Sequence, residues 1–187
     1  LFFDDDMMRE IERLAKRYPK RQALLLPALW MGKRKWGSLS SHVIEAVAEA
    51  VDVSPVKAYS VAAFYTMYNE KPIGKYHIQV CKSISCHLGG SEDTIKLFEK
   101  KLGIKVGETT ADGDFSLGVA ECLASCGSCP VAMIQVDVSK RAIMGNINGD
   151  YFEYLDECAI DNMLKKLRCD DWEGVARARL FDTGQNL

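Results

Sequence analysis

The chain has 187 residues, nearly half of them apolar, which is enough for one ordinary domain with a helical extension. Its 24 basic and 26 acidic residues give a formal net charge of −2. No basic run is interleaved with aromatic residues, so nothing in the sequence favours nucleic-acid binding. No apolar stretch approaches the roughly 18 residues that a membrane-spanning helix requires.

The first 70 residues show the patterns of helices. The acidic run Asp4–Asp6 suits a helix N-terminus. An apolar stripe follows at helical spacing and consists of Met8, Ile11, Ala15 and Tyr18. Pro27 lies inside the apolar run 22–30, which predicts a kink or a late helix start at that point.

A second helical face and a helix start are predicted before the pattern changes near residue 72. The face consists of Ile44, Val47, Ala48 and Val51, which recur at the spacing of a packed helix. Ser54 followed by Pro55 predicts an N-cap with proline at the first helical position. Residues 1–72 are therefore predicted to form a small helical bundle.

From residue 73 the sequence alternates between strand and helix patterns. Strands are predicted at Tyr76–Cys81, Phe115–Val119 and Val131–Val136. Helices are predicted at 91–102, ended by Gly103, and at 159–167, and turns at Asp112-Gly113 and Asn148-Gly149. This order predicts an α/β domain over residues 73–168, followed by a polar tail over residues 169–187.

Seven cysteines are present, an odd and clustered set that suits thiols kept as metal ligands in a reducing compartment rather than a disulfide framework. Cys81 and Cys86 have four residues between them, and Cys122 and Cys126 have three. Each pair follows a predicted strand, so the pairs suit a metal centre that bridges two loops. These wide spacings favour a [2Fe–2S] cluster, while zinc remains the alternative.

The loops around both pairs contain small residues whose backbone N–H groups could approach cluster sulfurs. They are Ser83, Ser85, Gly89 and Gly90 around the first pair, and Ser125, Gly127 and Ser128 around the second. A plant-type ferredoxin would have a further cysteine at position 89, where this chain has glycine. A Rieske centre needs two histidine ligands, and only His87 adjoins a cysteine.

Cys129 leaves two alternatives open. Cys126 and Cys129 form a Cys-Gly-Ser-Cys-Pro sequence typical of a dithiol redox motif, in which Cys126 would attack and Cys129 resolve. That reaction would leave the first cysteine pair without a role. Alternatively, Cys129 could replace Cys126 as a ligand, whereas Cys158 and Cys169 are expected to be ordinary thiols.

No nucleotide, flavin or hydrolytic motif accompanies the cysteines. The chain lacks both the G-x-G-x-x-G and the G-x-x-x-x-G-K-[ST] patterns. A chain with a one-electron centre and no substrate site is expected to be a carrier within a larger assembly.

Two long stretches resemble the small [2Fe–2S] subunit of the NADH-dehydrogenase module of respiratory complex I. They are the segment AFYTMYNEKPIGKYHIQVC, which ends at Cys81, and the segment from Lys100 to Cys126, which ends in AECLASC. The resemblance runs from about Arg9 to Leu167 and includes both cysteine spacings. It implies a thioredoxin-like [2Fe–2S] domain preceded by a helical region, with the cluster on Cys81, Cys86, Cys122 and Cys126.

The resemblance also implies the setting in which the chain works. Its partners would be the FMN- and NADH-binding flavoprotein and other peripheral-arm subunits of complex I. We expect no NADH oxidation by the chain alone and docking through the helices of Arg9–Asn69. The location implied is the matrix side of the mitochondrial inner membrane, or the cytoplasmic face of a bacterial plasma membrane. An NAD-linked hydrogenase or a formate dehydrogenase is the alternative assembly.

Three features depart from the family's usual pattern. Cys129 stands where the family has a small residue, and Ala124 stands where it has glycine. The connection between Pro130 and Asn148 is longer than usual, so either Val131–Val136 or Ile143–Ile147 could be the family's strand there.

Overall fold

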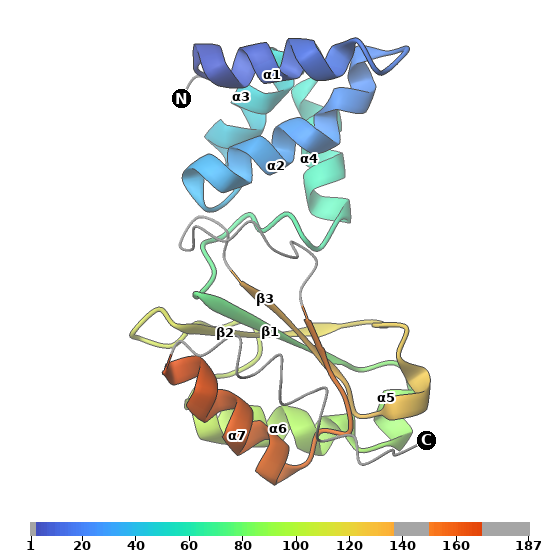
Figure 1. Ribbon diagram of the computed structural model, residues 1–187, viewed down its shortest axis with the longest axis vertical. Coiled ribbons are helices and arrows are strands. Elements are labelled where there is room, and N and C mark those ends of the chain that lie inside the picture. The colour runs from blue at the N-terminus through green and yellow to red at the C-terminus, as the bar shows by residue number, and fades with distance from the viewer. Residues whose placement is uncertain (1–2, 137–149, 170–187) are drawn as a thin grey trace. The chain divides into compact units, whose positions relative to one another are not determined.

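The computed structural model describes residues 3–136 and 150–169 (Figure 1). These residues form two compact units, one of residues 3–73 and the other of residues 74–136 and 150–169. Each unit has its own hydrophobic core. The predicted turn at Asn148-Gly149, the alternative strand at Ile143–Ile147 and the tail from residue 170 lie outside the described residues. No helix in the described part of the chain is long and apolar enough to cross a membrane.

The first unit is helical, as predicted. Its elements are α1 (Asp5–Ala15), the 3₁₀ helix η1 (Arg21–Leu24), α2 (Leu25–Trp36), α3 (Ser41–Val51) and α4 (Pro55–Phe64). The predicted face of α3 is confirmed, because Ile44, Val47, Ala48 and Val51 are all buried. Ser54 is the N-cap residue of α4 and Pro55 its first residue, although the Ser54 side chain makes no capping hydrogen bond.

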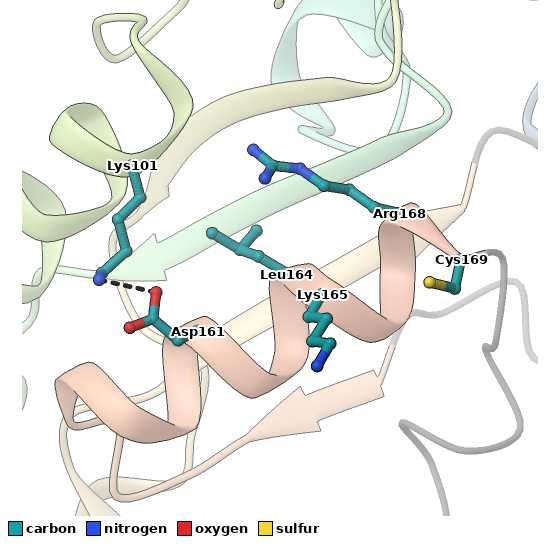
Figure 2. A pocket seen from close by; sticks show the side chains of 6 residues that line it. All are labelled: Lys101, Asp161, Leu164, Lys165, Arg168 and Cys169. Atoms are coloured by element: carbon teal, nitrogen blue, oxygen red, sulfur yellow. Dashed lines mark ion pairs between the residues drawn. The ribbon is translucent and has the colours of Figure 1, made fainter.

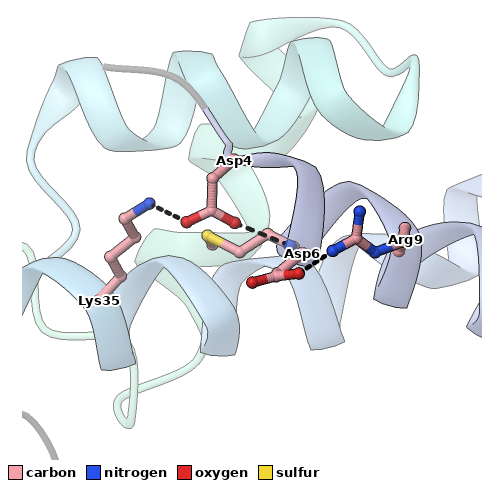
Figure 3. A network of polar contacts seen from close by, with 5 residues as sticks. Asp4, Asp6, Arg9 and Lys35 are labelled. Carbon is pink, nitrogen blue, oxygen red and sulfur yellow. Dashed lines mark hydrogen bonds and ion pairs between the residues drawn. The ribbon is translucent and has the colours of Figure 1, made fainter.

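The start of α1 is held by acidic side chains, as Figure 3 shows. Asp4 accepts a hydrogen bond from the Met7 N–H at 2.9 Å and pairs with Lys35 at 2.6 Å, while Asp6 pairs with Arg9. The predicted stripe of this helix was too long, because α1 ends at Ala15 and Tyr18 is exposed beyond it. Pro19 explains the difference, since a proline disfavours helical conformation in the residue before it.

Pro27 lies in the first turn of α2. Backbone N–H groups there have no acceptor within the helix, so the missing N–H of proline breaks no helical hydrogen bond. The helix begins at Leu25, after the 3₁₀ helix η1. The predicted late start is therefore confirmed.

The second unit is a four-stranded sheet with helices. Its elements are β1 (Tyr76–Cys81), α5 (Ile84–Leu88), α6 (Ser91–Leu102), β2 (Phe115–Ala120), the 3₁₀ helix η2 (Cys126–Ser128), β3 (Ala132–Val136), β4 (Asp150–Phe152) and α7 (Glu157–Arg168). The strand order is β2-β1-β3-β4, with β1 parallel to β2 and the other two pairings antiparallel. The helices α6 and α7 lie side by side on one face of this sheet (Figure 1).

The central strand β1 has buried residues on both of its faces. Tyr76, Ile78 and Val80 are buried in the main core of this unit, as expected for an inward face. Gln79 and Cys81, which alternate with these residues along the strand, are buried too. On that face Cys81 packs in an apolar cluster with Cys86, Leu123 and Val131. This burial places Cys81 at the protected carboxyl end of the central strand.

Candidate iron–sulfur site

The first cysteine pair is buried at the end of β1. Cys81 is the last residue of that strand, and Cys86 lies in α5, a short helix that the sequence analysis did not predict. The helix places Cys86 back against Cys81 in one apolar cluster with Leu123 and Val131. Burial, with a smaller contribution from the neighbouring Cys81 thiol, raises the pKa of the Cys86 thiol to about 11. An unliganded Cys86 is therefore a protonated thiol at neutral pH.

The second pair lies in the loop after β2 and is exposed. Ala124 in this loop has a left-handed backbone with a φ of 59°, and its N–H donates to Cys122 Sγ at 3.4 Å. This hydrogen bond lowers the pKa of the Cys122 thiol below its ordinary value, and the nearby Cys126 and Ser83 side chains act in the same direction. The loop thus favours the thiolate form of Cys122.

Parallel pairing of β1 with β2 brings the two cysteine loops together. Cys81 is in register with Ala120, and the Lys82 N–H donates to the Ala120 carbonyl at 2.9 Å. The Lys82 and Glu121 side chains form an ion pair at 2.9 Å across the same loops. Carboxyl ends of adjacent parallel strands meet at one edge of a sheet, so the two cysteine loops are neighbours at that edge.

Cys129 packs against the apolar cluster of the first cysteine pair, although it follows the second pair in sequence. It is half-buried and packs against the buried group that contains Cys86. Gly89, in the turn after α5, is its close neighbour: a Cβ added to Gly89 would lie 2.5 Å from Cys129 Sγ. Cys158 and Cys169 are exposed, in α7 and at its end, as expected of ordinary thiols.

A carboxylate that the sequence analysis missed sits beside the second loop. The hydroxyls of Ser125 and Ser128 both donate to Glu153 Oε1, Ser128 at 2.7 Å, and the expectation that backbone N–H groups here approach cluster sulfurs stays a prediction. Glu153 follows β4 directly. No signal near the cysteines in the sequence pointed to it, because the contact joins residues 25 or more positions apart.

One shallow pocket in this unit has no link to the cysteine pairs. It has a volume of about 400 Å³ and is lined by six residues: Lys101, Asp161, Leu164, Lys165, Arg168 and Cys169 (Figure 2). The Lys101–Asp161 ion pair, at 2.7 Å, joins α6 to α7 at one side of it. The pocket contains none of the four candidate ligands, and it borders the last described residue.

The donor set fits a two-iron cluster. Residues 3–136 and 150–169 contain no group of three or more His, Cys, Asp or Glu side chains close enough together to hold a metal ion. The thiols lie instead as two neighbouring pairs, and each iron of a [2Fe–2S] cluster takes two protein ligands. The Ala124 N–H supplies a donor to one sulfur, and the apolar cluster around the first pair limits access of water.

Paired thiols at the ends of two parallel strands, in a small sheet covered by helices, define a [2Fe–2S] carrier domain. The chain belongs to the thioredoxin-like [2Fe-2S] ferredoxin family, whose pattern matches residues 11–168. The expected fold class and cofactor are thereby confirmed.

Two relatives are named as subunits of NADH-quinone oxidoreductase. The chain is 38% identical to the NADH-quinone oxidoreductase subunit designated E 2 of Rhizobium meliloti over 162 residues, covering 87% of this chain and 89% of that protein. It is 39% identical to the subunit designated E of the same enzyme from Rickettsia conorii over 171 residues, covering 90% and 95%. The chain is thus a homologue of a subunit of an oxidoreductase complex, as the resemblance implied.

A solved structure supports the fold independently. The chain resembles part of an NAD+-reducing [NiFe]-hydrogenase in the air-oxidised state, with a TM-score of 0.62 and 22% sequence identity. The match covers 83% of this chain but only 26% of the hydrogenase chain. At this level of identity the likeness speaks for the fold alone.

Proposed function

We propose that this chain is the one-electron carrier subunit of an NADH-quinone oxidoreductase, with a [2Fe–2S] cluster held by Cys81, Cys86, Cys122 and Cys126. The observation that carries the proposal is the placement of the two cysteine pairs in neighbouring loops at the carboxyl ends of β1 and β2. When bound, the cluster supplies reversible transfer of a single electron. The protein supplies the thiolates, the Ala124 hydrogen bond and the apolar surroundings of the first pair.

Cys129 has no ligand role in this proposal. Its Sγ faces Gly89 at the side of α5, whereas Cys126 neighbours Cys122 in the exposed loop. A ligand set of Cys122 and Cys126 therefore keeps the second pair within one loop. The rival dithiol reaction would need Cys126 and Cys129 to pair and would leave Cys81 and Cys86 unused.

The electron donor in this proposal is the FMN- and NADH-binding flavoprotein of the same enzyme. A hydride from NADH carries two electrons, so the flavin must divide them before a one-electron carrier can accept one. The described residues hold no motif for NADH or flavin, and the chain alone should oxidise no NADH. We place the assembly on the matrix side of the mitochondrial inner membrane, with the bacterial cytoplasmic face as the alternative.

The flavoprotein has two candidate contact surfaces on this chain. In the helical unit, Val56 and Phe64 of α4 are each 76% exposed, which supports the expected docking role of Arg9–Asn69. In the second unit, Ile84 and Leu88 are 78% and 82% exposed, and both lie in α5, the helix that contains Cys86. We also propose that the domain boundary falls near residue 73, with the [2Fe–2S] domain at 73–168.

Affinity purification of the native assembly through a tag on this chain tests the proposed function. We expect an FMN protein and NADH-oxidising activity to co-purify, and no such activity in the separated chain. Recovery of hydrogenase or formate dehydrogenase subunits instead would favour the alternative assembly. A monomer that reduces disulfides through Cys126 and Cys129 would contradict both.

Charge substitutions separate the two contact surfaces. Phe64→Glu should reduce co-elution with the flavoprotein, because burying a carboxylate in an apolar contact is costly. Leu88→Glu should slow reduction of the chain by the flavoprotein, because it disturbs the contact beside the cysteines. Val106→Glu, an exposed apolar position in the loop after α6, is the matched control and should behave as the unaltered protein.

A further inference from the structure

A hydrogen-bonded group ties the loop of the second cysteine pair to the segment after β4. Ser125, between Cys122 and Cys126, donates its hydroxyl to Glu153 Oε1. The Ser128 hydroxyl donates to the same oxygen at 2.7 Å, and the two hydroxyl oxygens are 2.8 Å apart. A single carboxylate oxygen thus holds both side chains that flank Cys126.

Backbone contacts fix the same two segments in register. The Tyr154 N–H donates to the Ser128 carbonyl at 2.9 Å, and the Leu155 N–H donates to the Pro130 carbonyl at 3.2 Å. The loop that carries Cys126 therefore rests on the residues around Glu153, although its own cysteines are exposed. Loss of the carboxylate would leave the backbone contacts and the contacts between Ser125 and Ser128, but remove the side-chain anchor that ties both serines to residue 153.

The charge of Glu153 also acts on any group held by that loop. A [2Fe–2S] core with four thiolates has a formal charge of about −2, and one-electron reduction makes it more negative. A half-buried carboxylate beside the loop is poorly screened by water, so it disfavours the added electron. Such a carboxylate lowers the reduction potential relative to a neutral side chain of the same shape.

We propose that Glu153 is a positioning residue for the second cysteine loop, which it orders through Ser125 and Ser128, and that its charge lowers the reduction potential of the cluster. The inference rests on the proposed function. The reduction potential of the cluster would then be set in part by a residue of this chain and not by its partner alone.

The first test is Glu153→Gln, which keeps the size and one acceptor oxygen but removes the charge. Redox titration followed by EPR should give a higher reduction potential than in the unaltered protein. The matched control is Glu157→Gln in α7, the same chemical change on an exposed carboxylate. Its partner Lys101 keeps a second ion pair with Asp161 at 2.7 Å, so the control should leave the potential unchanged. Equal potentials in both variants would overturn the charge role.

The second test removes the hydroxyls and keeps the charge. Ser125→Ala with Ser128→Ala should leave the potential close to that of the unaltered protein but speed the loss of cluster. In the cluster-free chain, hydrogen exchange at the Tyr154 amide should quicken about tenfold, because its bond to the Ser128 carbonyl opens more often. Unchanged exchange and unchanged cluster retention would overturn the positioning role.

Should Glu153→Gln assemble no cluster, Glu153→Asp takes its place for the charge role. The shorter carboxylate keeps the charge, so the potential should stay near that of the unaltered protein while cluster loss quickens. A raised potential in Glu153→Asp would contradict the inference. An unaltered protein that holds no cluster at all would instead contradict the proposed function, so the two failures are distinguishable.

Discussion

The backbone N–H of Ala124 donates to Cys122 Sγ across 3.4 Å, and the backbone of Ala124 is left-handed, with a φ of 59°. Left-handed backbone is costly for a residue that has a Cβ and nearly free for glycine. Alanine at position 124, where the resembled family has glycine, therefore carries an energetic cost. Glycine at this position would allow the same turn without that cost.

We expect Ala124→Gly to raise the free energy of unfolding by about 1 kcal/mol, because it relieves the left-handed strain. Chemical denaturation of the cluster-free chain measures this directly. Ala120→Gly, at the end of β2, is the opposite control and should lower stability by roughly 0.5–1 kcal/mol. A destabilising effect of Ala124→Gly would show that the turn carries no strain.

Gly89 and Cys129 form a close contact that excludes a larger side chain at position 89. An added Cβ would lie 2.5 Å from Cys129 Sγ and 3.3 Å from the Ser85 carbonyl oxygen. We expect Gly89→Ala to lower the free energy of unfolding by about 1–3 kcal/mol, the usual cost of overpacking. Gly127→Ala, which has open space around it, should change stability little.

Adding Cys129→Ala to Gly89→Ala should recover part of that loss, because it removes the sulfur that the new methyl group meets. The recovery is partial, since the Cys129 Cβ would remain 3.0 Å from the added atom. Denaturation of the two single variants and the double variant gives the coupling between the sites. Strictly additive effects would contradict the contact.

Serine substitutions distinguish the ligands from the other thiols. Cys122→Ser or Cys126→Ser should remove or strongly perturb the cluster, since a thiolate bond to iron is lost. Cys129→Ser should leave cluster content nearly unchanged, with at most a modest change in potential from altered surroundings. Cys158→Ser in α7 is the inert control. Loss of the cluster in Cys129→Ser but not in Cys126→Ser would reverse the assignment.

Local pattern predicted much of the fold. Cap residues such as Asp4 and Gly103, and the alternation of Tyr76, Ile78 and Val80, are short-range signals, so the helices and strands that depend on them appear where expected. Tyr18 was misplaced because a periodic pattern does not register the effect of Pro19. Short α5 lacked enough residues to show a period, although it positions Cys86.

The site was predictable only where its chemistry was local in sequence. The cysteine spacings indicated the two pairs, and the predicted strands indicated that each pair follows a strand. Glu153 could not be foreseen, because its role depends on how β4 lies beside β3 and brings residue 153 to the cysteine loop. The resemblance to known subunits supplied the ligand set, which spacing alone left open between Cys126 and Cys129.

Metal analysis of the purified chain, prepared without oxygen, tests the central claim most directly. Iron, acid-labile sulfide and zinc are measured per chain, and EPR spectra are recorded before and after reduction. The account predicts about two irons and two sulfides per chain, no stoichiometric zinc, and a signal that appears only on reduction. Stoichiometric zinc with no signal in the reduced state would contradict it.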